Sequence, residues 1–528
     1  MIVLKVYRFN PDIDEDGYYK IYQVPFTKGM RVLDALHYIH DHLDGSLAYR
    51  WICRAGQCGS CSILVNGKAV LACQEEIKES GEAITLEPLS LFPVIKDLVV
   101  DTGEGYEKMR SCEPYLKREC AYSGPDELEA DDIKDVKKFR ECIECFCCVN
   151  ACPVVNQVWD DYFGPMVMRK LCELKMDKRD VGKRIDAALN EGLYHCTTCR
   201  NCWAVCPQEI EIPEKAIENM RAWAVEEGKG PLDSHNSLVQ SIKNYKNPWI
   251  MPRSKRAKWA KRLDIPSKGE VMFYAGCSPS LLFGERVPAK IIAVLRRIGI
   301  EPAYLGRDER CCGSPLLKVG DRKAYDEIVS ANIEQMKAAG VKTIVTTCAG
   351  CHKSWAVDYK EFFGDFGIDV KHITEIVLEA YEKGLIKFND IEKNHVRVTY
   401  HDPCHLGRGS GIYDAPRKLI KAMPGMELIE PERNRENSHC CGSGGGVKTG
   451  KPDVALKVGE ERVRMFDALD VEYVITCCPW CEQHIDDSIA ASDSPLYKTR
   501  DLIEIIEETM EHDIDGENIK GRIAKKSL

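Results

Sequence analysis

The sequence lacks the marks of a membrane-spanning or secreted protein. None of its apolar runs approaches the roughly 18 residues that cross a bilayer. The N-terminal MIVLKVYRFN has no basic segment followed by a long apolar stretch, so we expect no signal peptide and a cytoplasmic location. The net charge of −10 argues against nucleic-acid binding.

Marks of a nucleotide-binding protein are missing as well. No G-x-G-x-x-G follows a strand near the N-terminus. The stretch GGVKTGKP (445–452) comes near a P-loop, but Pro452 stands where the magnesium-binding Ser or Thr would be. We therefore predict no flavin or nucleotide site in this chain.

Cysteine is what the sequence has in excess. There are 27 cysteines among 528 residues. Without a secretion signal, metal binding or redox chemistry explains them better than a disulfide framework does. Thiolates select soft metals, chiefly iron–sulfur clusters or zinc. The spacing of the cysteines has to distinguish between these two.

The pattern of apolar, polar and turn-forming residues divides the chain into segments. Residues 1–100 alternate short strands and turns around one helical stretch, and residues 101–245 read as mostly helical. Residues 246–270 are expected to be a linker. Beyond them, strands alternate with helical stretches in two units, 271–395 and 396–528. We expect a multidomain protein of α+β and α/β class.

The last two units repeat each other. The offset between equivalent cysteines is nearly constant at 127, 129 and 130 positions, for the pairs Cys277 and Cys404, Cys311 and Cys440, and Cys348 and Cys478. Such a constant offset indicates an internal duplication.

The first cysteine motif is CRAGQCGSC with a distant fourth cysteine. C-x₄-C-x₂-C is the plant-type [2Fe–2S] spacing, and close-set glycines let a loop wrap the cluster and present backbone N–H groups to sulfur. The usual spacing of zinc-binding cysteine pairs fits only half of this loop. We predict a [2Fe–2S] cluster bound by Cys53, Cys58, Cys61 and Cys73.

The second and third cysteine motifs each contain C-x₂-C-x₂-C-x₃-C-P, a run in which the fourth cysteine binds the cluster of the other run. These motifs are CIECFCCVNACP and CTTCRNCWAVCP. Zinc is disfavoured because neither run breaks into isolated pairs. We predict two [4Fe–4S] clusters, one bound by Cys142, Cys145, Cys148 and Cys206 and the other by Cys196, Cys199, Cys202 and Cys152.

These motifs resemble the iron–sulfur subunit of succinate dehydrogenase and fumarate reductase over residues 1 to about 225. The resemblance implies a β-grasp plant-type ferredoxin domain at 1–100 and an α-helical two-cluster ferredoxin domain at 101–245. Most members lack the second cysteine of the last run and carry a [3Fe–4S] centre beside a quinone site. This sequence has Cys199 there, which puts quinone chemistry in doubt.

The duplicated unit resembles the CCG domain of heterodisulfide reductase catalytic subunits, also found in glycolate and glycerol-3-phosphate dehydrogenase subunits. In heterodisulfide reductase five such cysteines hold a non-cubane [4Fe–4S] cluster. The resemblance implies two such clusters here, unless one half is degenerate or holds zinc. The first CCG group is Cys277, Cys311, Cys312, Cys348 and Cys351, and the second CCG group is Cys404, Cys440, Cys441, Cys478 and Cys481.

Several cationic residues stand beside these cysteines in the sequence. They are read either as partners of cluster sulfur or as contacts for anionic groups of substrates. They are His352, Lys353, His405, Arg408, His439 and Lys448. If access to the two groups is uneven, we expect the more open side at 444–446, where SGGG replaces the SPLL of the first copy.

The fusion of both pieces resembles the thiol:fumarate reductase subunits of methanogenic archaea. It implies oxidation of coenzyme M and coenzyme B thiols to a heterodisulfide, with the CCG clusters splitting the electron pair. Electrons then pass to a flavoprotein docked on residues 1–100, which reduces fumarate. Two alternatives stay open: a quinone-linked respiratory subunit, and an electron-transfer subunit with another partner or with zinc in one CCG half.

Overall fold

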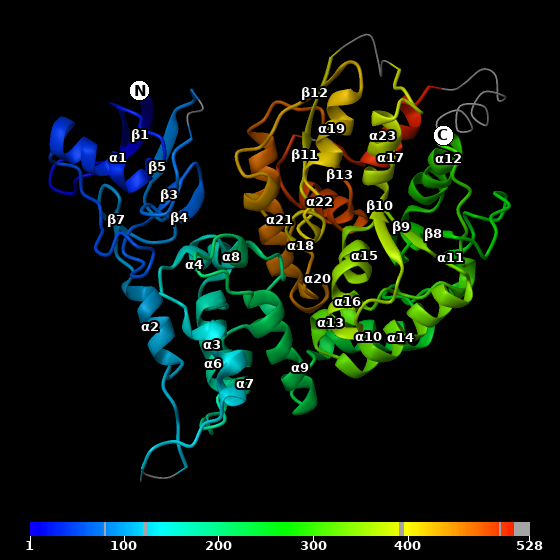
Figure 1. Cartoon of the computed structure of the whole chain (residues 1–528), viewed down its shortest axis with the longest axis horizontal. Coiled ribbons are helices and arrows are strands. Elements are labelled where there is room, and N and C mark those ends of the chain that lie inside the picture. The colour runs from blue at the N-terminus through cyan, green and yellow to red at the C-terminus, as the bar shows by residue number, and fades with distance from the viewer. Residues whose placement is uncertain (79–80, 120–123, 390–394, 496–497, 512–528) are drawn as a thin grey trace. The chain divides into compact units, whose positions relative to one another are not determined.

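The computed structural model describes residues 1–78, 81–119, 124–389, 395–495 and 498–511. The chain forms two compact units, 1–223 and 224–528, and each has its own core. Figure 1 shows both units, with elements labelled where there is room.

The first unit begins with a five-stranded mixed sheet in the order β2-β1-β5-β3-β4. Its strands are β1 (Ile2–Arg8), β2 (Tyr18–Val24), β3 (Ser62–Val65), β4 (Lys68–Leu71) and β5 (Ile84–Glu87). β1 runs antiparallel to β2 and parallel to β5. The expected helix forms as α1 (Val32–Tyr38), and four of its side chains are buried. A short hairpin of β6 (Val94–Lys96) and β7 (Val99–Val100) follows.

Helices make up the rest of the first unit. They are α2 (Gly103–Ser111), α3 (Ala130–Arg140), α4 (Cys147–Asn150), α5 (Val155–Val158), α6 (Pro165–Met176), α7 (Arg184–Asn190), α8 (Asn201–Ala204) and α9 (Asn219–Glu226), the last of which ends in the second unit. The two short helices α4 and α8 each follow a cysteine-rich loop and pack against each other. This packing brings the two loops together.

Two parallel sheets organise the second unit. Their equivalent strands follow the same order: β8, β9 and β10 of the first sheet correspond to β11, β13 and β14 of the second. The first has the order β10-β9-β8, and a bridge from Met272 to Ala303 adds one further pairing beside β8. The second has the order β12-β11-β13-β14. The strands are β8 (Val271–Tyr274), β9 (Thr343–Thr346), β10 (Asp369–His372), β11 (Val396–Tyr400), β12 (Met426–Leu428), β13 (Tyr473–Thr476) and β14 (Lys498–Asp501). The duplication seen in the sequence is therefore a duplication of topology.

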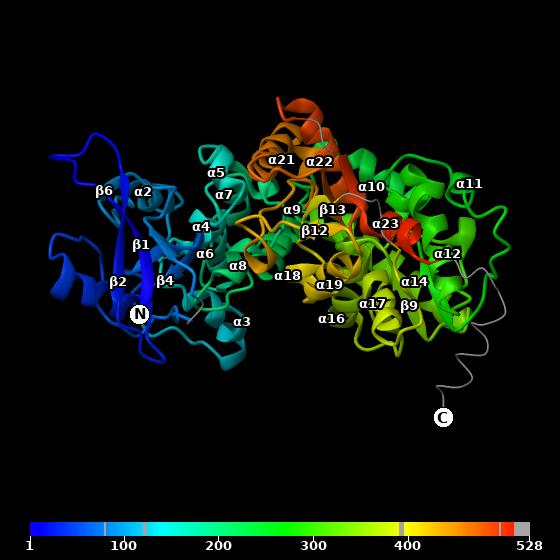
Figure 2. The ribbon, with the colours of Figure 1, turned by 90° about the horizontal axis from the view of Figure 1, so that it is seen from above.

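Helices surround both sheets. They are α10 (Asp233–Tyr245), α11 (Arg253–Arg256), α12 (Lys290–Arg297), α13 (Ser314–Val319), α14 (Arg322–Ala338), α15 (Ala349–Lys353), α16 (Tyr359–Phe363), α17 (Ile373–Glu382), α18 (Gly407–Ser410), α19 (Asp414–Ala422), α20 (Val447–Gly450), α21 (Pro452–Asp467), α22 (Pro479–Ala491) and α23 (Leu502–Thr509). The long helices α21 and α22 lie side by side in Figures 1 and 2.

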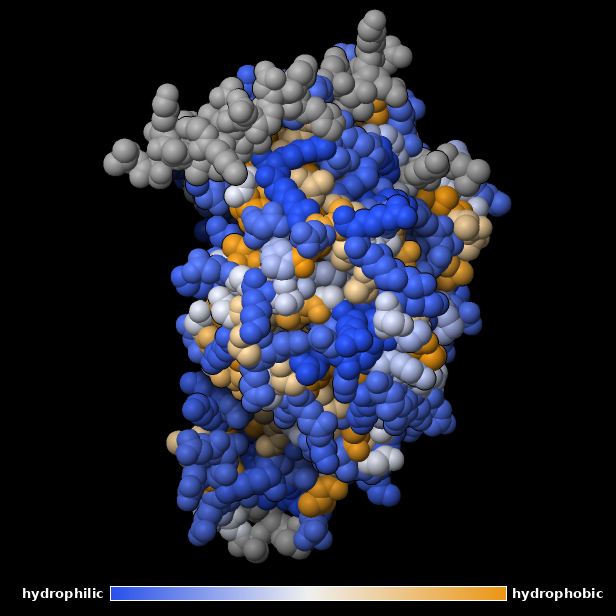
Figure 3. Space-filling model, turned by 90° about the vertical axis from the view of Figure 1, so that its right-hand side faces the viewer, coloured by the Kyte–Doolittle hydropathy of each residue, from blue (hydrophilic) through white to orange (hydrophobic). Residues whose placement is uncertain are grey.

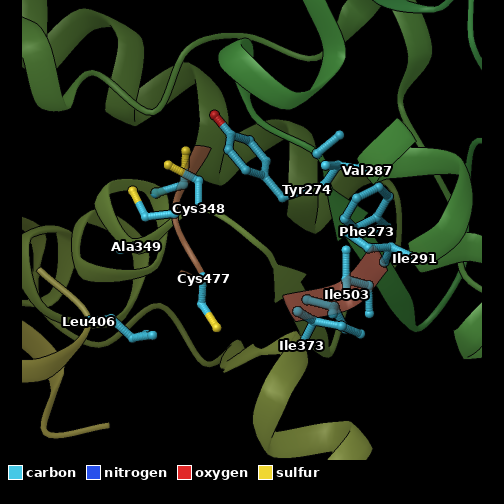
Figure 4. Close-up of a cluster of buried hydrophobic side chains, with 14 of the residues drawn as sticks. Phe273, Tyr274, Val287, Ile291, Cys348, Ala349, Ile373, Leu406, Cys477 and Ile503 are labelled. Carbon is cyan, nitrogen blue, oxygen red and sulfur yellow. The ribbon is translucent and has the colours of Figure 1, made fainter. Parts of the chain in front are cut away.

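One hydrophobic core joins the two halves of the second unit. It includes Phe273 and Ile291 from the first half and Cys477 and Ile503 from the second, all nearly inaccessible to solvent (Figure 4). Residues 246–270, which the sequence suggested as a linker, contain α11 and the buried Trp259, whose ring packs on Tyr304. The halves therefore fold as one body, and the cysteines at their strand ends keep fixed positions.

The surface is mainly hydrophilic on the face shown in Figure 3, where hydrophobic residues are scattered among charged ones. Among the described residues, none of the helices combines the length and the apolar composition that crossing a bilayer would need.

Candidate functional site

A cavity of about 120 Å³ lies at the carboxyl ends of the parallel strands in the second unit. Ligand sites of parallel α/β sheets form at this edge. Cys277 follows β8, Cys348 follows β9, Cys404 follows β11 and Cys478 follows β13. The cavity is lined by nine of the ten CCG cysteines, Cys277, Cys311, Cys312, Cys348, Cys351, Cys404, Cys441, Cys478 and Cys481.

Each CCG group is linked by the same sulfur contacts. Hydrogen bonds with Cys311 and Cys351 lower the pKa of Cys312. In the second group, hydrogen bonds with Cys440 and Cys481 lower the pKa of Cys441 in the same way. In both copies, the second cysteine of the adjacent pair is thus the point where the pair meets the C-x-x-C motif.

The two groups also touch each other. The side chains of Cys348 and Cys478, the first cysteines of the two C-x-x-C pairs, are hydrogen-bonded to one another, and this bond with Cys348 lowers the pKa of Cys478. The two groups therefore form one continuous site, and a molecule in the cavity can reach both.

The residues fit iron–sulfur clusters in their chemistry. The donors are thiols, most are buried, and no disulfide joins the cysteines that the structure describes. Buried thiols gathered in one site are the donor set that such clusters take. The second group has one further donor nearby: ligand atoms of His401, Cys441 and Cys481 lie within 4.8 Å of one another.

Two of the six cationic residues named from the sequence line the cavity. These are His405 and Lys448. Burial lowers the pKa of the His405 imidazole to about 3, so this ring is neutral near pH 7. The Lys448 ammonium lies 2.6 Å from Asp487.

The other four side chains have partners elsewhere. His352 contacts Ser410 through Nδ1 at 3.1 Å, and Lys353 forms a buried ion pair with Asp358. Arg408 donates to the Ser438 carbonyl at 2.7 Å, and the His439 ring lies 2.9 Å from the Cys440 carbonyl. A residue next to a cysteine in the sequence thus need not line the cavity that the cysteine lines.

One lysine in the cavity wall was not predicted from the sequence. Lys318 is 3% exposed and lines the cavity beside the first CCG group. It follows Cys312 by six residues, and Lys448 follows Cys441 by seven. A one-residue difference between SPLLK and SGGGVK hides their equivalence, but each copy contributes one lysine.

The glycine run of the second copy lines the cavity through 444–446. Gly446 has φ +78°, and a Cβ there would lie 2.9 Å from Val319 and 3.1 Å from His235. The His235 ring is also 2.9 Å from the Gly446 carbonyl. Close packing against α10 is therefore one reason for this glycine.

In the helical part of the first unit, the fourth cysteine of each run lies with the first three cysteines of the other run, as the sequence predicts. One pocket is lined by Cys142, Cys145, Cys148 and Cys206. Cys202 lies among Cys196, Cys199 and Cys152, and burial raises its pKa well above the usual range.

The two loops of this pair share an unusual backbone. Glu144 and Phe146 in the first loop, and Thr198 and Arg200 in the second, all have positive φ between 51° and 68°. Non-glycine residues in this conformation mark tightly constrained loops. Backbone N–H groups point at sulfur, as from Thr198 to Cys196 at 3.3 Å.

The N-terminal loop 53–61 also has backbone N–H groups that donate to sulfur. The Ala55 and Gln57 amides donate to Cys53 Sγ at 3.3 and 3.4 Å. A hydrogen bond from Ser60 lowers the pKa of Cys58 to about 6. Burial raises the pKa of Cys61 in the same loop to about 12, so the shift toward the thiolate applies to Cys58 and not to the loop as a whole.

Gly59 brings this loop against the next cysteine loop. A Cβ at Gly59 would lie 2.9 Å from the Cys145 Cβ and 3.0 Å from the Ile143 carbonyl. We expect Gly59→Ala to push the two loops apart and weaken the magnetic coupling between their clusters, measured by electron paramagnetic resonance of the reduced protein. Gly56→Ala is the control, because Gly56 has a similar φ of +68° and meets only the Gln74 side chain. Equal coupling in both variants would contradict the expectation.

The remaining cysteines that the structure describes are buried, and Cys120 lies outside the described residues. Cys147 contacts Ser62 Oγ at 3.6 Å, and its hydrogen bond with Cys145 lowers the pKa of that cysteine. Cys112, Cys172 and Cys477 are also buried, and Cys477 does not line the cavity of the second unit.

Three family models match the chain in the order of its cysteine motifs. One, described as a 2Fe-2S iron-sulfur cluster binding domain, matches residues 3–107. A 4Fe-4S dicluster domain matches 138–210, and a cysteine-rich domain matches twice, at 271–354 and 398–486.

Curated relatives match over most of the chain. The chain is 37% identical to a subunit of fumarate reductase (CoM/CoB) from Methanothermobacter marburgensis, over 96% of this chain and 99% of that protein. It is 34% identical to a subunit of dihydromethanophenazine:CoB–CoM heterodisulfide reductase from Methanosarcina mazei, over 61% of this chain and 78% of the relative. A solved hypothetical protein of Helicobacter pylori, 13% identical, shares the fold over 98% of this chain and 96% of its own, with a TM-score of 0.59.

Identity at this level over nearly the full length of both proteins, together with the matching order of domains, shows the family. The chain is an iron–sulfur oxidoreductase subunit that belongs to the same family as the fumarate reductase (CoM/CoB) subunit of Methanothermobacter marburgensis.

Proposed function

We propose that this chain oxidises coenzyme M and coenzyme B thiols to their heterodisulfide and delivers the electrons to a flavoprotein that reduces fumarate. The two thiols lose two protons and two electrons as the S–S bond forms. Fumarate takes up two electrons and two protons to become succinate. The reaction therefore needs no other oxidant or reductant.

The observation that carries the proposal is the single cavity shared by both CCG groups. A heterodisulfide forms from two different thiols, so both sulfur atoms must be held within bonding distance of each other. Support comes from the contact between the side chains of Cys348 and Cys478, which joins the two cysteine groups in one cavity. When bound, iron–sulfur clusters supply one-electron carriers and iron atoms that bind thiolate sulfur.

The chain's own residues hold and screen the substrates. Lys318 and Lys448, one from each copy, give the cavity two cations for acidic end groups such as sulfonate and phosphate. His405 lines the same cavity as a neutral polar group. Pro248, Leu238 and Trp480 close the wall, and the Trp480 ring packs on Trp249 at 4.8 Å between centroids. These side chains form an apolar part of the cavity wall.

The first unit is the proposed route to the partner. Its three sets of cysteines match the arrangement of a [2Fe–2S] and two [4Fe–4S] centres. Trp51 and Ile52, which directly precede Cys53, are 43% and 72% exposed. Apolar side chains exposed at a redox centre are typical of a docking surface. The flavoprotein is therefore expected to dock on residues 1–100.

The electron donor distinguishes this proposal from a quinone-linked subunit. The purified complex is assayed for fumarate reduction with both thiols, and separately with a menaquinol analogue. We expect turnover with the thiols and none with the quinol. Turnover with the quinol alone would overturn the proposal.

His401 favours a second candidate, in which the second CCG group holds a single zinc ion and relays no electrons. A histidine and two cysteines are common zinc ligands. Metal analysis separates the two candidates. Five clusters require about 18 iron atoms per chain, whereas zinc in one group leaves about 14 iron and one zinc. We expect the higher iron content, with no stoichiometric zinc.

A further inference from the structure

Cys277 has a buried cation against its sulfur. The Arg256 guanidinium donates from Nη2 to Cys277 Sγ at 3.1 Å, and Arg256 is 1% exposed. Arg256 is the last residue of α11, outside both stretches matched by the cysteine-rich domain model. It therefore reaches the first CCG group from a neighbouring segment.

The arginine is held rigidly. Its Nη1 donates to Glu309 at 2.6 Å, and Nη2 also donates to the Lys246 carbonyl at 3.1 Å. Glu309 is itself fixed, because it accepts hydrogen bonds from the amides of Ala275 and Gly276, at 2.8 and 3.0 Å. The guanidinium is a preorganised planar fork that cannot rotate away from the sulfur.

A fixed cation on a ligand sulfur stabilises the state with the most negative charge. For a cluster bound by thiolates, the reduced state carries one more negative charge than the oxidised state. Hydrogen bonds to sulfur are among the factors that set the potentials of such centres. The carboxylate of Glu309, which is held by the amides of Ala275 and Gly276, offsets part of this effect, but the group that donates to the sulfur is the guanidinium.

We propose that Arg256 is a positioning residue that raises the reduction potential of the centre in the first CCG group. This proposal rests on the proposed presence of clusters in both groups. Because Arg256 contacts Cys277, the effect falls mainly on the first group. The first group then accepts an electron more readily than it would without the arginine.

The test is a redox titration of the full-length protein with dithionite, followed by electron paramagnetic resonance. The signal of the first group is identified by its loss in Cys351→Ala. We expect Arg256→Gln to shift the reduction equilibrium of that centre at least about tenfold toward the oxidised state, which is 59 mV for one electron. Arg256→Lys keeps the charge but loses the fork, and we expect a smaller shift in the same direction.

The matched control is Arg184→Gln, which removes another buried arginine paired with a buried carboxylate, Asp180. It should leave both CCG signals in place. Equal shifts of both CCG centres, or no shift in iron-replete Arg256→Gln or Arg256→Lys, would overturn the proposal. Loss of the first group's iron in both variants, with Arg184→Gln intact, would mean that Arg256 acts on assembly and not on the potential. The titration uses dithionite, so its result does not depend on whether thiols are the natural donor.

Discussion

Replacing Cys478 with alanine should abolish thiol oxidation. Cys478 contacts both Cys348 of the other copy and Cys481 of its own, so its loss removes a ligand where the two groups meet. We expect activity to fall more than about 100-fold, because loss of an outer partner of a metal ligand alone costs up to that much. Iron should fall by about four atoms per chain if the second cluster is lost.

The adjacent cysteine is the control. Cys477 is 2% exposed, packs in the hydrophobic core and contacts Tyr400 instead of the cavity (Figure 4). We expect Cys477→Ala to keep its iron and activity and to lose about 1–2 kcal/mol of unfolding free energy. If Cys478→Ala retains full iron and activity, the assignment of the second CCG group is wrong.

Neutralising Lys318 should weaken substrate binding without removing iron. A hydrogen bond to a charged group contributes about 1.5–3 kcal/mol, so we expect Lys318→Gln to raise KM for one of the two anionic thiols about 10- to 100-fold. Lys448→Gln, the equivalent change in the second copy, should raise KM for the other thiol. Steady-state assays that vary one thiol at a time measure both values.

Lys457 provides the control, because it is an exposed lysine of the second half, which also contains Lys448. Lys457→Gln should leave both KM values unchanged. A thiol without an acidic group should react equally well with the Lys318 variant and the wild type. If instead KM stays constant and only the redox potentials move, Lys318 balances charge on the cysteine groups and does not bind substrate.

Much of the site could be predicted from the sequence because cysteine motifs are local. The spacing within each loop fixes which sulfur atoms can meet, and the near-constant offset between copies indicated two equivalent groups. The swapped partners Cys206 and Cys152 followed from the same spacing rule. The strands could be placed because each apolar run ends at a cysteine.

The side chains that surround the cysteines could not be predicted in this way. His352 and Lys353 follow Cys351 within α15, and consecutive helical residues point about 100° apart, so neither shares the direction of the sulfur. Lys318 was missed because a one-residue difference between the copies breaks the offset. Arg256 was missed because its contact with Cys277 depends on tertiary packing of a segment that resembles a linker.

The most direct test of the central claim is the product formed by the protein's own thiol oxidation. The oxidised, iron-replete complex is mixed anaerobically with coenzyme M and coenzyme B without fumarate, and thiol products are identified by mass spectrometry while cluster absorbance is followed. We predict bleaching only when both thiols are present, with the mixed disulfide as the product. Bleaching by either thiol alone, or full bleaching without the mixed disulfide, would contradict the claim that the two CCG groups join two different thiols in one cavity.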